Sequence, residues 1–351
     1  MKHFFKTFNM TMLLVGTVVG AGFASGAEIV KFFGILGWWG IPCAIIAGVL
    51  MFLIILLFLK TAEIVGKGDV HSINRAVFPN SHIVMDIIIP FNYLIITASM
   101  FGAADALFAP YTPFPFAGLI TLALVFLAAY FGISGLQKAN MALVPLLAVL
   151  LAVVCVFNIA APDGGYYASK GAAAVQYLLH APVYAGMNML LSAGVIFGLK
   201  TDKKTAFRAA LWSCVIITAF IILIILALFA GGKGAQSAEL PIMVLAGRMN
   251  FTWPAMIVIW VGIFTSASAS AYALHQSARQ YIKNKALSLL AVLAAGYAVS
   301  RLGFSAIIAL FYPISGIIGI IFAVYAAIFV IKNRYQGTSK DAIKSSPLMS
   351  M

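Results

Sequence analysis

The sequence predicts an all-α transmembrane protein of ten helices, arranged as a 5+5 inverted repeat in which helices 1 and 6 are broken. Of its 351 residues, 63% are hydrophobic and only 9% are charged, whereas a soluble domain carries about 25% charged residues. The apolar runs continue for about twenty residues, the length of a spanning helix, whereas barrel strands alternate over about ten. Lipid must therefore be the solvent of this chain, and helices must satisfy its backbone.

Ten apolar runs are long enough to be expected spans. They cover residues 8–33, 38–59, 84–109, 114–131, 139–160, 172–199, 207–230, 253–278, 285–300 and 304–331. Residues 8–160 form the first predicted repeat and residues 172–331 the second. The stretch 240–249 is too short to cross and is expected to fold as a short helix over one face. The polar tail 332–351 is expected to be disordered.

Positive charge sets the predicted orientation. With the N-terminus inside, 17 of the 22 lysines and arginines fall in inner segments, which places both termini in the cytoplasm. The net charge is +13, and the charged residues are scattered between the apolar runs without forming a dense block. This distribution therefore indicates topology and a lipid bilayer partner, with no nucleic acid. The first apolar run is interpreted as a retained span and not as a cleaved signal peptide.

The first span contains four glycines, Gly16, Gly20, Gly22 and Gly26. Each lowers helix stability by about 1 kcal/mol relative to Ala, so a break is expected near residues 20–22. Freed carbonyls at such a break attract cations, and freed N–H groups attract anions. The alternative is close packing of small residues, because the glycines also fit two GxxxG pairs.

The sixth span has a similar interruption at the same depth. Pro182 and Gly186 lie among the polar residues His180, Tyr184 and Asn188, which predicts a second break. Interrupted spans at matching positions of two halves indicate a solute site at the middle of the membrane.

Polar residues within other spans complete the candidate site. The eighth span carries Thr265, Ser266, Ser268 and Ser270, whose hydroxyls either bond to carbonyls one turn back or bind Na⁺. Glu28 follows the first break, and a carboxylate in the membrane is a functional candidate. The alternative is that Glu28 meets water or pairs with Lys31 at (i, i+3).

The sequence also excludes several classes of function. There is no GxxxxGK[ST] motif for an ATP-driven pump and no HExxH or metal-spaced Cys/His cluster. Cys43, Cys155 and Cys214 lie within apolar runs and are expected to be buried hydrophobic residues. We expect no enzyme activity and no covalent cofactor.

The chain resembles a known group of bacterial membrane proteins. The opening Val-Gly-Thr-Val-Val-Gly-Ala-Gly-Phe-Ala-Ser-Gly-Ala-Glu with its following Phe-Phe pair, the Tyr184-x-x-x-Asn188 pattern and the Glu-Leu-Pro at 239–241 look like those of the YkvI-type proteins. That group is similar to the amino-acid/polyamine/organocation superfamily with the LeuT fold. The resemblance implies a bacterial cytoplasmic (inner) membrane location.

The resemblance also implies roles for individual residues. It places the solute at Gly20, Ala21, Gly22 and Phe23 of span one and at Tyr184 and Asn188 of span six. Glu28, from its own position after the break, is a candidate proton site or amine partner. It places Na⁺ at the carbonyls of Gly16, Val19 and Gly262 and at the hydroxyls of Thr265 and Ser266. Some superfamily members replace this Na⁺ with a lysine in span five, and residues 141–157 contain none.

The resulting prediction is a secondary active transporter that works by alternating access on a small solute. The solute is an amino acid or a related amine or acid, coupled to Na⁺, with H⁺ as the alternative ion. Two other hypotheses remain open: a nutrient-sensing membrane receptor subunit of the same fold, similar to the germinant receptors, and a passive channel. The sequence leaves the substrate, the direction of transport and the oligomeric state undetermined.

Overall fold

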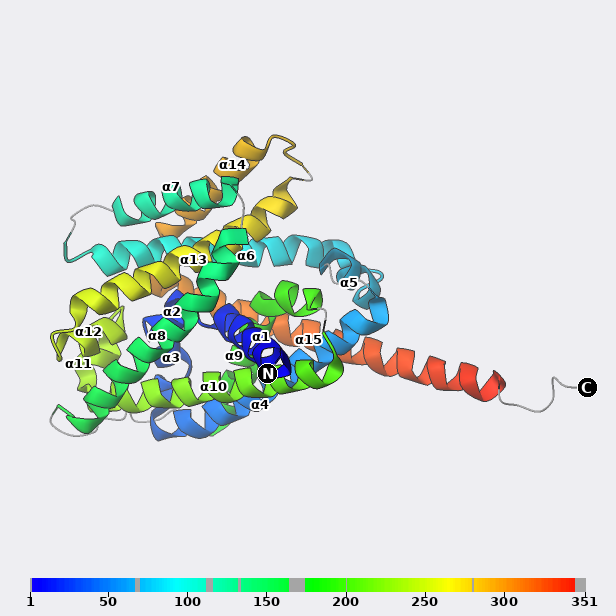
Figure 1. Cartoon of the computed structure of the whole chain (residues 1–351), viewed down its shortest axis with the longest axis horizontal. Helices are drawn as coiled ribbons and strands as arrows, with labels where there is room; N and C mark the ends of the chain where they lie inside the picture. Colours follow the sequence, from blue (N-terminus) through cyan, green and yellow to red (C-terminus); the bar gives the residue numbers. More distant parts are fainter. Residues whose placement is uncertain are drawn as a thin grey trace, which may run out of the picture.

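A computed structural model describes residues 2–66, 70–111, 116–131, 134–163, 174–199, 201–279 and 281–344, and every regular element in them is a helix (Figure 1). Ten of these helices coincide with the ten expected spans. They are α1 (Lys2–Val18), α4 (Gly40–Val65), α6 (His82–Phe108), α7 (Phe116–Phe131), α8 (Ser134–Ala160), α9 (Ala174–Gly198), α10 (Lys203–Ala230), α13 (Thr252–Ala278), α14 (Lys285–Ser300) and α15 (Phe304–Lys344).

Six helices among the described residues are long and apolar enough to cross a membrane, namely those within 34–65, 82–108, 179–198, 203–230, 252–278 and 304–333. Four shorter apolar helices, at 4–18, 116–131, 144–160 and 285–300, occupy the other expected spans. The chain therefore has the composition of a multi-pass membrane protein, while the count of ten crossings stays a prediction.

The short elements lie between or at the ends of these helices. They are α2 (Ala21–Ala24), α3 (Ala27–Phe32), the 3₁₀ helix η1 (Gly34–Trp39), α5 (Val70–Val77), α11 (Gly232–Ser237) and α12 (Pro241–Gly247). Helix α12 is the short helix expected at 240–249. In Figure 1, α11 and α12 lie at one end of the bundle, and α5 and the end of α15 lie at the other.

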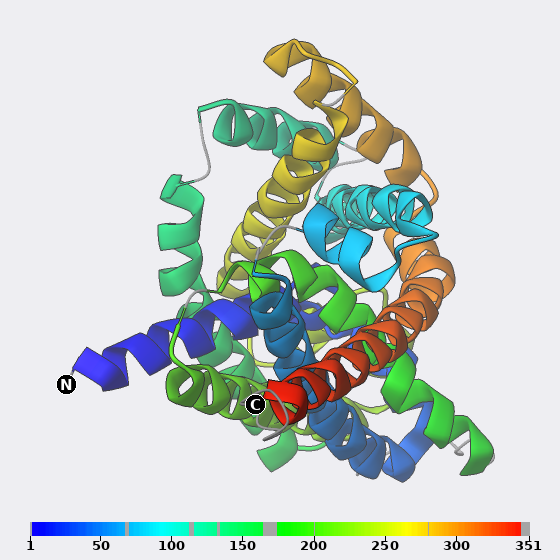
Figure 2. The same cartoon turned by 90° about the vertical axis from the view of Figure 1, so that its right-hand side faces the viewer.

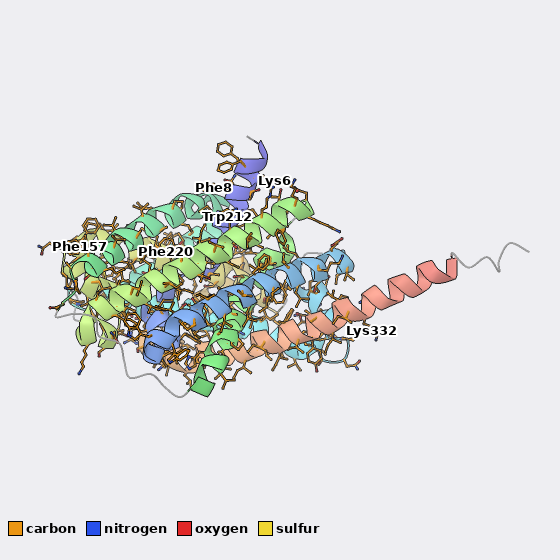
Figure 3. All side chains as sticks on the ribbon, turned by 90° about the horizontal axis from the view of Figure 1, so that it is seen from below. Lys6, Phe8, Phe157, Trp212, Phe220 and Lys332 are labelled. Atoms are coloured by element: carbon orange, nitrogen blue, oxygen red, sulfur yellow. The ribbon has the colours of Figure 1, made fainter. Side chains whose placement is uncertain are left out.

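The outer surface of the bundle is apolar, as lipid contact requires. Trp212 of α10 is 55% exposed and Phe157 of α8 is 42% exposed, and Figure 3 shows both side chains on the outside of the bundle. The first turns of α1 project from the bundle (Figure 2), so that Phe4 and Phe8 are also exposed.

Helices that the two predicted repeats make equivalent pack against one another. Helix α1 contacts α9, α4 contacts α10, and α6 contacts α13. The interior of the bundle is therefore built from α1, α6, α9 and α13, with α15 packed along α9.

The predicted break in span one is confirmed. Helix α1 ends at Val18, and the Gly20 N–H donates to the Val18 carbonyl (2.9 Å) instead of to Gly16, four residues back. A second interruption separates α2 from α3 at Gly26, whose φ of 81° is a left-handed conformation that glycine adopts readily. Helix α12 covers this point, because the Ile242 N–H donates to the Ser25 carbonyl (2.9 Å).

The predicted break in span six is wrong. Helix α9 runs without interruption from Ala174 to Gly198, with Pro182 inside it. Gly186 serves close packing instead, because a Cβ placed there would overlap the backbone of Gly316 and Ile320 in α15. The reciprocal Cβ on Gly319 would overlap the Gly186 carbonyl. The small residues bring two helices together, and neither has to unwind.

The last helix extends into the C-terminal tail. Helix α15 continues to Lys344, so the segment predicted to be disordered from residue 332 is helical over most of its length (Figures 1 and 2). Residues 345–351 lie outside the described part of the chain.

Candidate functional site

A cavity of about 330 Å³ lies beside the first interruption of span one. Six elements contribute to its wall, namely α1, α3, α6, α9, α13 and α15, together with the residues between α1 and α2. The lining residues are Met12, Leu13, Gly16, Thr17, Val18, Gly20, Glu28, Tyr93, Ile96, Met100, Asn188, Leu191, Gly194, Val195, Ser266, Ala269, Ser270, Tyr272, Ala273 and Tyr312.

The lining residues recur at helical spacing, so each helix presents one face to the cavity. On α1 the part-exposed lining residues are Met12, Leu13, Gly16 and Thr17, and Gly20 continues the lining just after the helix. On α13 the series is Ser266, Ala269, Ser270 and Ala273. The lined part of α1 lies on the N-terminal side of its break. The cavity therefore extends from the break toward the end of the bundle where α1 begins.

Glu28 is the acidic residue among those that line the cavity, and only 5% of it is exposed. Its carboxylate lies over Gly22, where a Cβ would overlap the Glu28 oxygen. The Oε2 atom has no hydrogen-bond partner among the described residues, and neither does the hydroxyl of Tyr184. Glu28 is close enough to Tyr184 and Tyr312 to interact with both electrostatically. No ion pair with the exposed Lys31 forms in the described structure.

Packed aromatic rings close the other side of Glu28. The ring of Tyr184 packs edge-on against Phe32 and Phe33, with centroid distances of 5.3 and 4.8 Å. Phe23 and Phe33 are fully buried. Beyond them, α12 is tied to α8, because Arg248 donates to the Asn158 Oδ1 (2.7 Å). The cavity is therefore sealed toward the end of the bundle that carries α11 and α12.

The oxygen atoms expected to hold a cation belong to the end of α1, to the residues that follow it and to α13, and the two segments form a junction at Gly20 and Ser266. The Gly16 carbonyl lacks its usual helical donor at the break, and a Cβ on Gly20 would lie 3.9 Å from the Ser266 Oγ. The Thr265 hydroxyl donates to the Gly262 carbonyl (3.0 Å). This bond to a carbonyl one turn back is the alternative to Na⁺ binding that the sequence left open. Carbonyl and hydroxyl oxygens are ligands that suit a hard monovalent cation.

Helix α8, the fifth span, covers this junction with apolar side chains. A Cβ on Gly16 would lie 2.9 Å from Val144, and one on Gly262 would lie 3.2 Å from Leu147. No lysine of the described chain lines the cavity.

The structure brings only part of the predicted set together around the cavity. Gly16, Gly20, Glu28, Asn188 and Ser266 line it. The remaining predicted residues do not line it, namely Val19, Ala21, Gly22, Phe23, Tyr184, Gly262 and Thr265. Tyr184 is fully buried against aromatic rings, and the Asn188 side chain donates to the Tyr184 carbonyl (3.0 Å).

Sequence reasoning missed the contributions of α6 and α15. Tyr93 and Met100 line the cavity from α6, and Tyr312 lines it from α15. The Tyr312 hydroxyl is 3.0 Å from the Ser99 Oγ. The available signal was the seven-residue spacing of Tyr93 and Met100, which places them on one helix face, but apolar and aromatic residues are common on every span.

Comparisons with known proteins agree with this architecture. The chain is 24% identical over 333 residues to "Uncharacterized membrane protein YkvI" of Bacillus subtilis (strain 168), covering 90% of this chain and 93% of that protein. No known protein-family profile matches the chain.

Two solved structures have the same arrangement of helices. One is Mhp1, a nucleobase-cation-symport-1 family transporter in a closed conformation with bromovinylhydantoin bound (TM-score 0.63, 13% identity, 92% of this chain and 77% of that chain). The other is the inward-facing conformation of Mhp1 (TM-score 0.62, 12% identity, 92% and 75%). The resemblance to YkvI is thus confirmed, and the protein has the helical membrane fold of LeuT-type transporters.

Proposed function

We propose that the protein is a secondary active transporter that binds a small solute in the central cavity and moves it by alternating access. The observation that carries this proposal is the position of the cavity. It lies at the interrupted first span, between the helices that the two repeats make equivalent. Interrupted helices beside a cavity at mid-depth are the usual construction of a solute site in transporters with inverted repeats. The shared fold with Mhp1 supports the same function.

The state of the cavity fits one half of a transport cycle. It is lined along the N-terminal part of α1 and sealed by Phe23, Phe33 and Tyr184 on the other side. Positive charge predicts that both termini are cytoplasmic. With that orientation, in a bacterial inner membrane, the solute site faces the cytoplasm in this structure.

Coupling to Na⁺ is the second part of the proposal. Two observations support it: the Gly16 carbonyl has lost its helical donor at the break, and Ser266 of α13 approaches Gly20, which follows α1. Bound there, Na⁺ would join the broken span to α13 and thereby link ion occupancy to the shape of the solute cavity. The residues that would hold it are Gly16, Val19, Gly262, Thr265 and Ser266.

The test is uptake into proteoliposomes with and without an inward Na⁺ gradient. The double variant Thr265→Ala with Ser266→Ala should remove Na⁺-dependent uptake while the protein still folds. Ser268→Ala is the matched control, because this serine also bonds back to its own helix (to the Phe264 carbonyl, 2.8 Å) but does not line the cavity. Unchanged Na⁺ dependence in the double variant removes the ion site. Ligand binding with no flux under any gradient removes transport and favours a sensing subunit.

A further inference from the structure

The described wall of the central cavity contains a single carboxylic acid and no basic residue. Among the twenty described lining residues, Glu28 is the one acidic residue, and no lysine, arginine or histidine accompanies it. A solute that enters this space therefore meets one acidic side chain and no basic one.

The Glu28 carboxylate is also incompletely satisfied. Its side chain is 5% exposed, and its Oε2 atom has no hydrogen-bond partner among the described residues. A buried carboxylate without partners is strongly unfavourable, and a cation that donates hydrogen bonds to it removes most of that penalty. An alkylammonium group combines both properties, since it carries a positive charge and N–H donors.

The same carboxylate disfavours an anionic group at the break. Freed backbone N–H groups at the break are where a solute carboxylate would otherwise dock. Here the Glu28 carboxylate already lies over Gly22, in the space that a Cβ of Gly22 would fill. A second carboxylate at Gly20–Gly22 would lie beside a like charge in a region of low dielectric, which is repulsive.

The rest of the wall is apolar or aromatic. The helices contribute aliphatic and thioether side chains such as Leu13, Ile96 and Met100, and three tyrosines, Tyr93, Tyr272 and Tyr312. Aliphatic groups favour an apolar solute body, and tyrosine rings attract organic cations. The volume of about 330 Å³ is at the lower end of the range for small-molecule sites.

From these observations we propose that the solute is an organic amine with an apolar or aromatic body and no carboxylate, whose ammonium group binds the Glu28 carboxylate. This inference rests on the proposed function, because it specifies the substrate class of the same cavity. It narrows the three solute classes that the sequence left open to one.

The test is a thermal-shift series on the full-length purified protein with matched probes. Each series keeps one carbon skeleton and changes only the polar groups: 2-phenylethylamine, phenylalanine, 3-phenylpropionate and 2-phenylethanol, and then isopentylamine, leucine and 4-methylpentanoate. A ligand that binds the folded state raises Tm by mass action. We expect the two amines to raise Tm in a concentration-dependent manner, and the amino acids, acids and alcohol to have little effect.

Variants then identify the residue that binds the ammonium group. Glu28→Gln should weaken the amine response on the order of 100-fold or more, because it removes one partner of a buried charged pair. Asp105→Asn is the control. This carboxylate also lies at a helix of the bundle, where it accepts from the Gly118 N–H (2.7 Å) and from Arg301 (3.3 Å), but it does not line the cavity. Its amine response should match that of the native protein.

Three results would overturn the inference: no response to either amine, an equal or larger response to the amino acids or acids, or an amine response that survives Glu28→Gln. If Glu28→Gln does not fold, the comparison of amines with amino acids and acids on the native protein still tests whether the site prefers an amine. Amine binding without flux would refute transport and leave the amine site intact. Gradient-driven uptake of an amino acid or acid, with no amine response, would refute the amine site alone.

Discussion

The contact between α9 and α15 gives a sharp stability prediction. Gly186 and Gly319 face each other, so that a Cβ on either would overlap the backbone of the other helix. Gly186→Ala adds one methyl group at this contact. If Gly186 is present to allow close packing, as the uninterrupted α9 indicates, this small change should be strongly destabilising.

The magnitude follows from which atoms the methyl group would meet. Overpacking a well-packed interior costs about 1–3 kcal/mol, and flexible side chains reduce that penalty by rotating away. Here the opposing atoms are the Gly316 carbonyl oxygen and the Ile320 backbone nitrogen, which cannot rotate away, so α9 and α15 must separate. We expect a loss near the upper end, about 3 kcal/mol. Helix propensity alone would favour alanine by about 1 kcal/mol.

The assay is reversible unfolding of the purified protein in mixed detergent micelles, followed by the circular dichroism of its helices. Gly198→Ala is the control on the same helix, because a Cβ there would meet nothing within 4 Å, and it should be neutral or slightly stabilising. A Gly186→Ala protein as stable as the native one would refute the packing argument.

Two further predictions concern access and pH. Ala269→Cys should react with a membrane-impermeant thiol reagent added from the side where α1 begins, because Ala269 is exposed in the cavity. Phe23→Cys should not react, because Phe23 is fully buried. Equal labelling of Ala269→Cys in inside-out and right-side-out vesicles would contradict the conclusion that aromatic residues seal the other side of the cavity. The Thr205 N–H donates to Asp202 (2.9 Å) at the start of α10 and holds the pKa of that carboxyl below its usual range. Because the folded pKa is depressed, this stabilisation is fully present above about pH 3.9, the ordinary aspartate value, and is lost as the pH falls further. The stability difference between native protein and Asp202→Asn should therefore be largest near neutral pH and shrink in acid; a difference that is constant with pH would refute the assignment.

Much of the helical framework could be predicted because it depends on local properties. Span length and hydropathy placed most of the apolar helices close to their observed bounds, since lipid requires continuous apolar runs. The first expected span, 8–33, is instead divided among α1, α2 and α3. The break in span one was predictable for the same reason. Gly16, Gly20, Gly22 and Gly26 weaken the helix within the run itself, and the structure interrupts the helix beside two of them, at Gly20 and Gly26.

The error in span six has a physical explanation. Gly186 and Pro182 look like a break when α9 is considered alone, but the residues that explain Gly186 are Gly316 and Gly319, more than a hundred positions later. Long-range packing of this kind leaves no local signal. The tyrosines of α6 and α15 in the cavity wall were missed for a similar reason, because nothing near Tyr93 or Tyr312 in sequence distinguishes them from lipid-facing aromatic residues.

The central claim is that the cavity beside the break in span one is where the solute binds. The most direct measurement is an experimental structure of the full-length protein determined with 2-phenylethylamine. We expect ligand density in this cavity, with the amine nitrogen within hydrogen-bonding distance of the Glu28 carboxylate. Ligand density elsewhere on the protein, with this cavity closed by side chains, would contradict it.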